Sequence, residues 1–264
     1  MLGIIGAIII IGLICLVGAT VLVVAAHLMQ VKTDERVEAV QEALPGANCG
    51  ACGYAGCADY ASAVVNKGEG ANLCVPGGKK TAEAVAFIMG TSPKEVGELR
   101  AVVNCCGING KAKEEYLYTG LSTCAASNVL HGGSKACSYA CLGFGDCARA
   151  CTFDALHVEN GVAVVDARKC TGCGACKKVC PKNIIWIREK SAKPAVLCSS
   201  QSRGAATRAA CTAGCIACMK CEKICPTQAI KVAGNLARIE LQKCISCNKC
   251  VEVCPVQVIF LIAG

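Results

Sequence analysis

The stretch Cys170-Thr-Gly-Cys173-Gly-Ala-Cys176-Lys-Lys-Val-Cys180-Pro181 decides how this chain folds. Its spacing is C-x2-C-x2-C-x3-C-P, and two further copies keep that spacing unchanged. They lie at Cys215, Cys218, Cys221, Cys225-Pro226 and at Cys244, Cys247, Cys250, Cys254-Pro255. Cysteines at such short intervals make poor long-loop disulfides and good chelates for a metal centre. The chain is therefore built on a repeated metal-binding unit.

A fourth, altered copy lies upstream, at Cys137, Cys141, Cys147 and Cys151, with Thr152 in the place of the proline. The spacing is typical of bacterial two-cluster ferredoxins, in which three cysteines of a run bind one [4Fe–4S] cluster and the fourth binds its neighbour. Applied to neighbouring copies, this rule predicts two small α+β ferredoxin-like domains with two clusters each. The predicted ligand sets are Cys137, Cys141, Cys147 and Cys180; Cys170, Cys173, Cys176 and Cys151; Cys215, Cys218, Cys221 and Cys254; and Cys244, Cys247, Cys250 and Cys225.

Two segments between the paired copies have the pattern of β-hairpins. Residues 156–165 and 230–239 alternate around the turn dipeptides Asn160-Gly161 and Gly234-Asn235. Aromatic residues make up only 4% of the chain, too few for a large hydrophobic core. We expect the clusters to take the place of much of that core.

A separate cysteine module precedes the repeats. Cys49, Cys52 and Cys57 can converge from one tight, glycine-rich loop, and Cys74 can complete a set of four thiolates. The alternative is a structural zinc knuckle, but zinc sites usually consist of two C-x2-C pairs, whereas three of these ligands fall within nine positions. The spacing favours a fifth [4Fe–4S] cluster in a small, mainly helical domain, with helices expected over 33–43 and 58–65.

The N-terminal segment is long and apolar. Residues 2–28 contain no Asp, Glu, Lys or Arg, and about 20 such residues suffice for a helix that crosses a membrane. A cleaved signal peptide would need a positive region before a shorter apolar core, and the first basic residue is Lys32. The pattern predicts a single transmembrane helix, with Lys32 and Arg36 placing the remainder in the cytoplasm.

The charge of the chain changes once its cysteines are assigned. The formal net charge is +8 with every one of the 26 cysteines counted as neutral. Twenty thiolates contribute −20 and five oxidised cores contribute +10, which leaves about −2. Nucleic acid is therefore excluded as a partner. Cysteines placed in the cytoplasm also stay reduced, which excludes a secreted disulfide scaffold.

Six cysteines have no place in this scheme. Cys105, Cys106 and Cys124 could join another residue around a sixth cluster, but no known spacing supports it, and buried structural thiols are the default. Cys211 competes with Cys215 for one ligand position, and the repeat favours Cys215. The full list without a role is Cys15, Cys105, Cys106, Cys124, Cys198 and Cys211.

The motifs, taken in order, resemble a known family. The chain is similar to the B subunit of Rnf complexes, the ion-translocating ferredoxin:NAD oxidoreductases. The similarity rests on an apolar N-terminal segment followed by LPGANCGACGYAGC, Cys74-Val-Pro-Gly-Gly, GGSKACSYACLGFGDCARACTFDAL and CTGCGACKKVCPKNII. The second ferredoxin pair resembles the extended form found in anaerobes such as clostridia. The chain departs from the family at Thr152 and at the doubled cysteine Cys105-Cys106.

The resemblance implies a role in electron transfer. Electrons would pass from reduced ferredoxin through the clusters to the set that contains Cys49, and then to flavin and iron–sulfur centres of other membrane subunits in an ion-translocating oxidoreductase. The chain has no nucleotide-binding motif and no catalytic triad, so it is expected to convert no substrate itself. The rival functions are a polyferredoxin subunit of a membrane hydrogenase or carbon monoxide dehydrogenase system, and a zinc-scaffold interaction protein.

The expected organisation follows from these motifs. It comprises a membrane anchor (1–30), a 4Fe-4S domain (31–100), a connector (101–132), a first ferredoxin-like domain (133–190), a linker (191–210) and a second ferredoxin-like domain (211–264).

Overall fold

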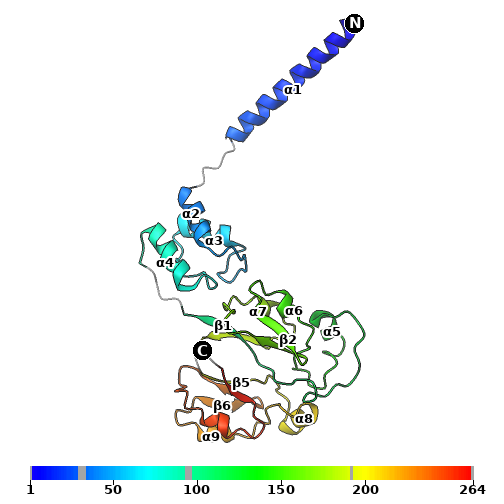
Figure 1. The fold of residues 1–264 in the computed structure, drawn as a ribbon, viewed down its shortest axis with the longest axis vertical. Coiled ribbons are helices and arrows are strands. Elements are labelled where there is room, and N and C mark those ends of the chain that lie inside the picture. The colour runs from blue at the N-terminus through cyan, green and yellow to red at the C-terminus, as the bar shows by residue number, and fades with distance from the viewer. Residues whose placement is uncertain (1, 29–33, 93–96, 191–192, 263–264) are drawn as a thin grey trace.

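The chain forms a lone helix, a helical module and two ferredoxin-like units in succession (Figure 1). The structure is a computed structural model that describes residues 2–28, 34–92, 97–190 and 193–262, and within the first helix it describes side chains only for residues 12–25. Lys32, on which the expected orientation in part rests, and the expected domain limit at residue 30 lie outside the described residues. Mixed helices and strands agree with the α+β class expected from the sequence.

Helix α1 (Leu2–Leu28) extends away from the rest of the chain (Figure 1). Its described apolar side chains are exposed: Leu16 is 66% and Leu22 is 71% accessible. Among the residues that the structure describes, no helix combines the length and the apolarity needed to cross a membrane.

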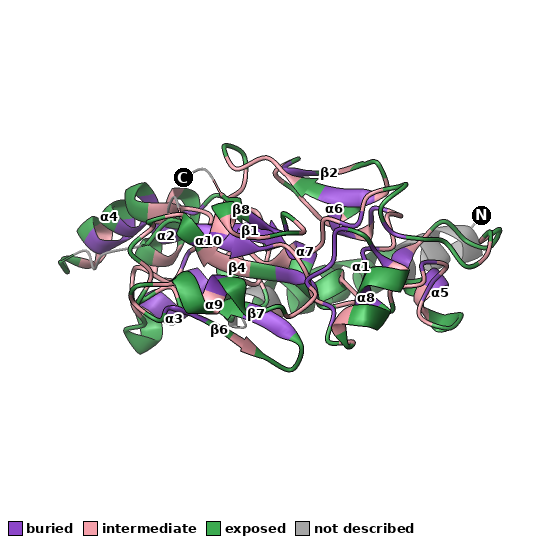
Figure 2. Ribbon diagram, turned by 90° about the horizontal axis from the view of Figure 1, so that it is seen from below, coloured by how far each residue is buried: buried purple, intermediate pink, exposed green. Residues whose placement is uncertain are grey.

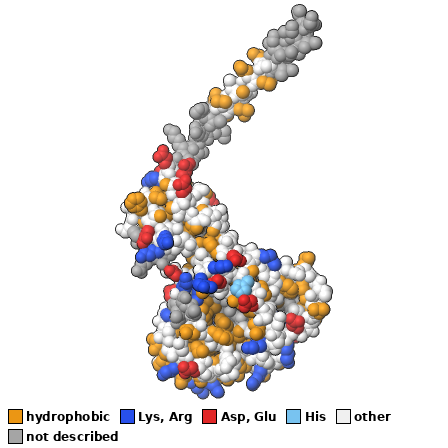
Figure 3. Space-filling model, in the orientation of Figure 1, with side chains coloured by type: hydrophobic (Ala, Val, Ile, Leu, Met, Phe, Trp, Pro, Cys, Tyr) orange, Lys and Arg blue, Asp and Glu red, His pale blue; other side chains and the backbone are white. Residues whose placement is uncertain are grey.

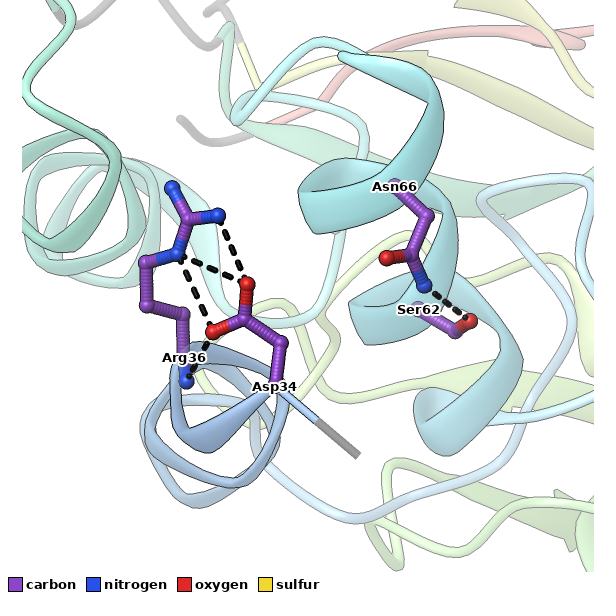
Figure 4. A network of polar contacts seen from close by, with 4 residues as sticks. All are labelled: Asp34, Arg36, Ser62 and Asn66. Carbon is purple, nitrogen blue, oxygen red and sulfur yellow. Dashed lines mark hydrogen bonds and ion pairs between the residues drawn. The ribbon is translucent and has the colours of Figure 1, made fainter. Parts of the chain in front are cut away.

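The helical module spans residues 35–90 and contains α2 (Glu35–Ala43), α3 (Cys57–Lys67) and α4 (Gly78–Met89). Asp34 caps α2, because its carboxylate accepts the Arg36 backbone N–H at 3.0 Å and pairs with the Arg36 guanidinium (Figure 4). Figure 4 also shows Ser62 and Asn66 bonded one turn apart along α3. Val40, Tyr60 and Val85 are almost fully buried between the three helices. The two helices expected in this region are confirmed.

Unit 1, residues 99–190, is closed by its first and last strands. Strand β1 (Leu99–Val103) pairs antiparallel with β4 (Ile185–Glu189), with Val103 opposite Ile185. Between them lie α5 (Cys124–Val129), α6 (Asp146–Arg149), the β2 (Leu156–Glu159) and β3 (Val162–Val165) hairpin, and α7 (Ala175–Val179). Asn160 and Gly161 both adopt positive φ, 47° and 75°, as a tight two-residue hairpin turn requires. The predicted hairpin is confirmed.

Unit 2, residues 194–262, repeats this plan. Strand β5 (Pro194–Val196) pairs antiparallel with β8 (Ile259–Leu261), and β6 (Ile230–Ala233) forms the second predicted hairpin with β7 (Leu236–Ile239). Helices α9 (Lys220–Ile224) and α10 (Lys249–Glu252) stand where α6 and α7 stand in unit 1. Helix α8 (Gly204–Ala210) lies before the first cysteine of the repeat.

The core of each unit is small and rich in cysteine. In unit 1, Ile184 and Ile185 pack with Cys141, Cys147 and Cys176. In unit 2, Ile230 and Ile259 pack with Cys215, Cys221 and Cys250 in the same way. Figure 2 shows buried residues on the strands of the two units and also on helices α3 and α4 of the helical module. The cysteines thus stand where larger apolar residues would fill an ordinary domain.

Strand pairing draws two segments expected to be connectors into the units. Strand β1 begins at Leu99 and extends into the segment expected as a connector from residue 101. The segment expected as a linker, 191–210, contains β5 and α8. Each unit therefore includes a strand that lies well before its first repeat cysteine.

Candidate iron–sulfur sites

The cysteines of the helical module face one cavity, as their spacing predicts. Cys49, Cys52, Cys57 and Cys74 line it together with Tyr60. The side chain of Asn48 accepts the backbone N–H of Cys57 at 2.8 Å and so fixes the start of α3 beside the cavity. Burial raises the pKa of the Cys74 thiol, and the nearby thiols of the other three cysteines raise it further.

The second set of unit 1 also comes together. Burial first, and then the thiols of Cys170, Cys173 and Cys151, raise the pKa of Cys176 to about 12. Strand β1 supplies a backbone N–H to this set, from Ala101 to the Cys170 sulfur at 3.3 Å. A backbone N–H donated to a ligating sulfur stabilises a reduced cluster and raises its potential.

Glycine is required in the loop of this set. At Gly172 φ is +74°, and an added Cβ would lie 2.5–2.7 Å from backbone and Cβ atoms of Leu99. The loop can approach β1 only because position 172 has no side chain. The glycine inside the C-x2-C motif therefore allows the close contact with Leu99 that brings the Ala101 N–H of β1 next to the cysteine loop.

Unit 2 gathers both of its predicted sets. Cys215, Cys218, Cys221 and Cys254 line one cavity. Burial raises the pKa of Cys221 to about 12, and the thiols of Cys215, Cys218 and Cys254 contribute to the increase.

The other set of unit 2 follows the crossed rule as well. Burial raises the pKa of Cys250, and the thiols of Cys244, Cys247 and Cys225 raise it further. The backbone N–H of Ala229, the residue before β6, donates to the Cys225 sulfur at 3.3 Å. A backbone amide at a strand therefore donates to a sulfur of this set, as the Ala101 amide of β1 does in unit 1.

The first set of unit 1 differs from the predicted one in a single member. Cys141, Cys147 and Cys180 line a cavity together with Cys124, and Cys137 is not among its lining residues. Burial raises the pKa of Cys147 to about 12, and the first two thiols that add to it are those of Cys141 and Cys124. Cys137 lines a different cavity, with Cys105, Cys198 and other residues.

Cys124 reaches this set through the position of α5. The Thr123 side chain caps that helix by accepting the Ala126 N–H at 3.1 Å, and Asp146 of α6 accepts the Ala125 N–H at 3.0 Å. These two bonds hold the first residue of α5, Cys124, beside the cavity. Cys124 lies outside every run of closely spaced cysteines, so no local spacing could have identified it.

The donor sets fit [4Fe–4S] clusters. Each offers four thiols, several of them with a pKa so raised that they stay protonated unless a positive centre replaces the protons. Among the described residues, no three His, Cys, Asp or Glu side chains are placed to share a single metal ion. In a [4Fe–4S] cluster each thiolate binds a different iron. Four sulfurs around one cavity are therefore the arrangement that such a cluster requires.

A buried lysine lies among these sets. Lys135 is 6% exposed, and its ammonium donates to the carbonyls of Gly107 at 3.3 Å and Gly161 at 2.8 Å. Burial raises the pKa of Cys141 and of Cys211, and the positive charge of Lys135 counteracts part of that increase. Such a charge offsets part of the negative charge that ligating thiolates bring into the interior.

Comparison with known proteins finds iron–sulfur family models over three parts of the chain. Family models match residues 44–76 as a putative Fe-S cluster, residues 163–186 as a 4Fe-4S binding domain and residues 214–258 as a 4Fe-4S dicluster domain.

Curated relatives match most of the chain. The B subunit of the Na+-translocating ferredoxin:NAD+ oxidoreductase complex of Acetobacterium woodii is 40% identical over 235 residues, which cover 89% of this chain and 71% of that protein. The proton-translocating counterpart of Clostridium ljungdahlii is 43% identical, with 77% and 72% covered, and the B subunit of the ion-translocating oxidoreductase complex of Methanosarcina acetivorans is 38% identical, with 84% of each covered. Fold and site together define a ferredoxin-type iron–sulfur protein with several [4Fe–4S] domains. More particularly, the chain belongs to the family of B subunits of ion-translocating ferredoxin:NAD+ oxidoreductase, or Rnf, complexes.

Proposed function

We propose that this chain is the electron-transfer subunit of such a complex, taking electrons from reduced ferredoxin and delivering them to partner subunits that carry flavins and iron–sulfur centres. Five [4Fe–4S] clusters in the sets described above, with Cys124 in the place of Cys137, accept and release one electron at a time. The observation that carries the proposal is that the helical module and both units each contain a cavity lined by four cysteine side chains.

Contacts between the sets support a continuous route towards the helical module. Within unit 1, the thiol of Cys176 lies close enough to that of Cys147 to raise its pKa. Between unit 1 and the module, the thiol of Cys49 likewise raises the pKa of Cys173, after the larger effect of burial. The ammonium of Lys178, on α7, also donates to the carbonyls of Cys49 at 3.5 Å and Gly50 at 3.4 Å. The set that contains Cys49 is therefore the exit of the route.

Unit 2 suits the entry of electrons. Cys218 and Cys247 are exposed, whereas all the other repeat cysteines are partly or fully buried. Basic residues also outnumber acidic ones in unit 2, and Figure 3 shows Lys and Arg side chains at the end of the molecule that unit 2 forms. They are Arg203, Arg208, Lys220, Lys223, Lys231, Arg238, Lys243 and Lys249, against Glu222, Glu240 and Glu252. Such a surface suits an acidic protein donor.

Helix α1 is proposed to anchor the chain in the cell membrane as a single span. The support is a helix of 27 residues without Asp, Glu, Lys or Arg, whose described apolar side chains are exposed. Arg36 follows it and favours a cytoplasmic location for the cluster domains. We propose the domain limits given above, with β1 assigned to unit 1 and with β5 and α8 assigned to unit 2.

The Cys74→Ala variant tests the route, with Cys15→Ala as its matched control because Cys15 is exposed on α1. In membranes that contain the complete complex, Cys74→Ala should abolish ferredoxin-dependent NAD+ reduction, while the clusters of unit 2 are still reduced by ferredoxin. Undiminished NAD+ reduction would refute the proposed exit.

Two further results would support the rival functions. A colourless anaerobic preparation that contains zinc and neither iron nor sulfide would indicate a zinc scaffold. Ferredoxin-dependent NAD+ reduction that persists after deletion of the whole chain would indicate a polyferredoxin of another membrane system.

A further inference from the structure

A further cysteine-lined cavity lies where the two units meet. We call it the junction cavity. Its cysteines are Cys105, Cys106, Cys137, Cys198 and Cys211, and it is also lined by Gly107, Ser200, Thr207 and Gly214. Four of these five cysteines belong to no copy of the repeat, and the fifth is Cys137, which the first set of unit 1 does not use.

Four of the five sulfurs accept backbone N–H groups. Cys105 accepts from Cys141 at 3.4 Å, and Cys198 accepts from Cys215 at 3.4 Å and from Ser200 at 3.5 Å. The sulfurs of Cys137 and Cys211 also accept backbone N–H groups, from residue 139 and from residues 213 and 214. Amides aimed at sulfur are the surroundings that ligating thiolates have in iron–sulfur proteins.

The sulfur of Cys106 behaves differently. It donates its proton to the carbonyl of Ala213 at 3.5 Å, which is the role of a thiol and not of a ligating thiolate. Cys106 is thus the spare member, and four acceptor sulfurs remain, the number that one [4Fe–4S] cluster needs.

The four acceptor sulfurs are close to one another. A Cβ added to Gly107 would lie 3.3 Å from the Cys211 sulfur and 3.6 Å from the Cys105 sulfur, so both face the same point. The thiols of Cys105 and Cys211 lie near that of Cys137, and Cys137 in turn lies near Cys198. The buried ammonium of Lys135 bonds to the carbonyl of Gly107 and supplies positive charge beside the cavity.

We propose that Cys105, Cys137, Cys198 and Cys211 hold a sixth [4Fe–4S] cluster. Two of the ligands occupy equivalent positions, since Cys105 and Cys198 each lie two residues beyond the first strand of their unit, β1 and β5. Each unit thus contributes one cysteine from the same structural position, as expected for a site at the interface between two similar units.

The joint itself is well defined. The backbone N–H of Lys113 donates to the carbonyl of Ala210 at 2.9 Å, and that of Thr212 donates to the carbonyl of Lys111 at 3.0 Å. The Ser199 hydroxyl donates to the Asn104 carbonyl at 2.9 Å. These bonds join the segments that carry Cys105 and Cys211, so unit 1 and unit 2 contribute ligands from a fixed interface.

The position suggests a bridge for electrons between the two units, and this role rests on the proposed function, whereas the site itself does not. One electron would arrive from unit 2, reduce the core from 2+ to 1+ and leave for unit 1, with no proton transferred and no bond broken. Without it, the relay would need a direct transfer between the clusters of the two units.

Iron and acid-labile sulfide per full-length chain, purified without oxygen, test the site. The unaltered chain should contain about 24 irons, and about 20 if only five clusters exist. The Cys198→Ala variant should lose up to four irons and one electron of the reductive titration with titanium(III) citrate, from about six to about five. Its matched control, Cys106→Ala, should keep all the iron and the full electron count.

Several outcomes would overturn the proposal. They are about 20 irons in the unaltered chain, the same iron content in Cys198→Ala as in the parent, equal losses in both variants, or zinc in the place of the missing iron. If Cys198→Ala does not fold, Cys198→Ser retains an oxygen ligand, and a changed EPR spectrum of one cluster is then expected; an unchanged spectrum counts against the site. A chain with about 20 irons would still support the proposed function, whereas a chain without iron would refute both.

Discussion

The assignment of Cys124 to the first set of unit 1 can be tested by pairs of substitutions. Cys124, Cys141, Cys147 and Cys180 line one cavity, and Cys137 lines another. One cluster holds four irons, so two substitutions in the same set together remove no more than about four irons, whereas substitutions in different sets remove the sum of their separate losses. We expect Cys124→Ala/Cys147→Ala to lose about four irons, and Cys137→Ala/Cys147→Ala to lose up to about eight.

The assay is iron and sulfide analysis of the anaerobic full-length chain, with the three single variants measured beside the two double variants. The spacing of the repeat makes the opposite prediction, because it places Cys137 with Cys147 and leaves Cys124 without a role. If the losses of Cys124→Ala and Cys147→Ala add up while those of Cys137→Ala and Cys147→Ala do not, the structural assignment is refuted. Circular dichroism of each variant controls for unfolding.

Three other perturbations have outcomes that follow from single residues. Gly172→Ala should lower the free energy of unfolding by about 2–4 kcal/mol, since it adds a positive-φ cost to a collision with Leu99; Gly174→Ala, at φ +79° but without such a collision, should cost only about 1–2 kcal/mol in thermal unfolding. Lys135→Met removes a buried charge and should make the potential of a neighbouring cluster more negative by about 70 mV, for a charge at roughly 10 Å and an effective dielectric constant of about 20; an unshifted EPR redox titration would contradict this. Burial is the main cause that raises the pKa of Cys176 to about 12, so cluster binding must displace protons from the thiols. Cluster binding should therefore weaken as the pH falls, by up to about 10,000-fold per pH unit when four thiols are protonated. Equal iron release to a chelator at pH 6 and pH 8 would contradict this.

Features that depend on neighbours in the sequence were predictable from the sequence. The ligands within one repeat are separated by two or three residues, and the two hairpins turn at Asn160-Gly161 and Gly234-Asn235. In these cases the spacing itself determines the local geometry, so the hairpins and the ferredoxin-like units follow from the order of residues alone.

Features that depend on distant pairing were not predictable in the same way. Strand β1 is held by β4, and β5 by β8, across the whole length of a unit. Cys105 and Cys198 owe their positions to these strands, and Cys124 owes its own to the capping of α5. None of these cysteines has a neighbour at ligand spacing in the adjoining repeat, so the sequence pattern left them as ordinary buried thiols.

The closing strand pair of each unit has a consequence for how such a protein can change in length. Leu99 lies opposite Glu189, and Pro194 lies opposite Leu261, so the chain enters and leaves each unit at the same place. Each unit is connected to the rest of the chain through a two-stranded stem. A whole unit can therefore be inserted or deleted while the rest of the chain keeps its course. With the clusters proposed above, a protein of this design could be lengthened in steps of one two-stranded stem and two clusters. Each new stem would need a cysteine at the position of Cys105 and Cys198 to link its unit to the one before.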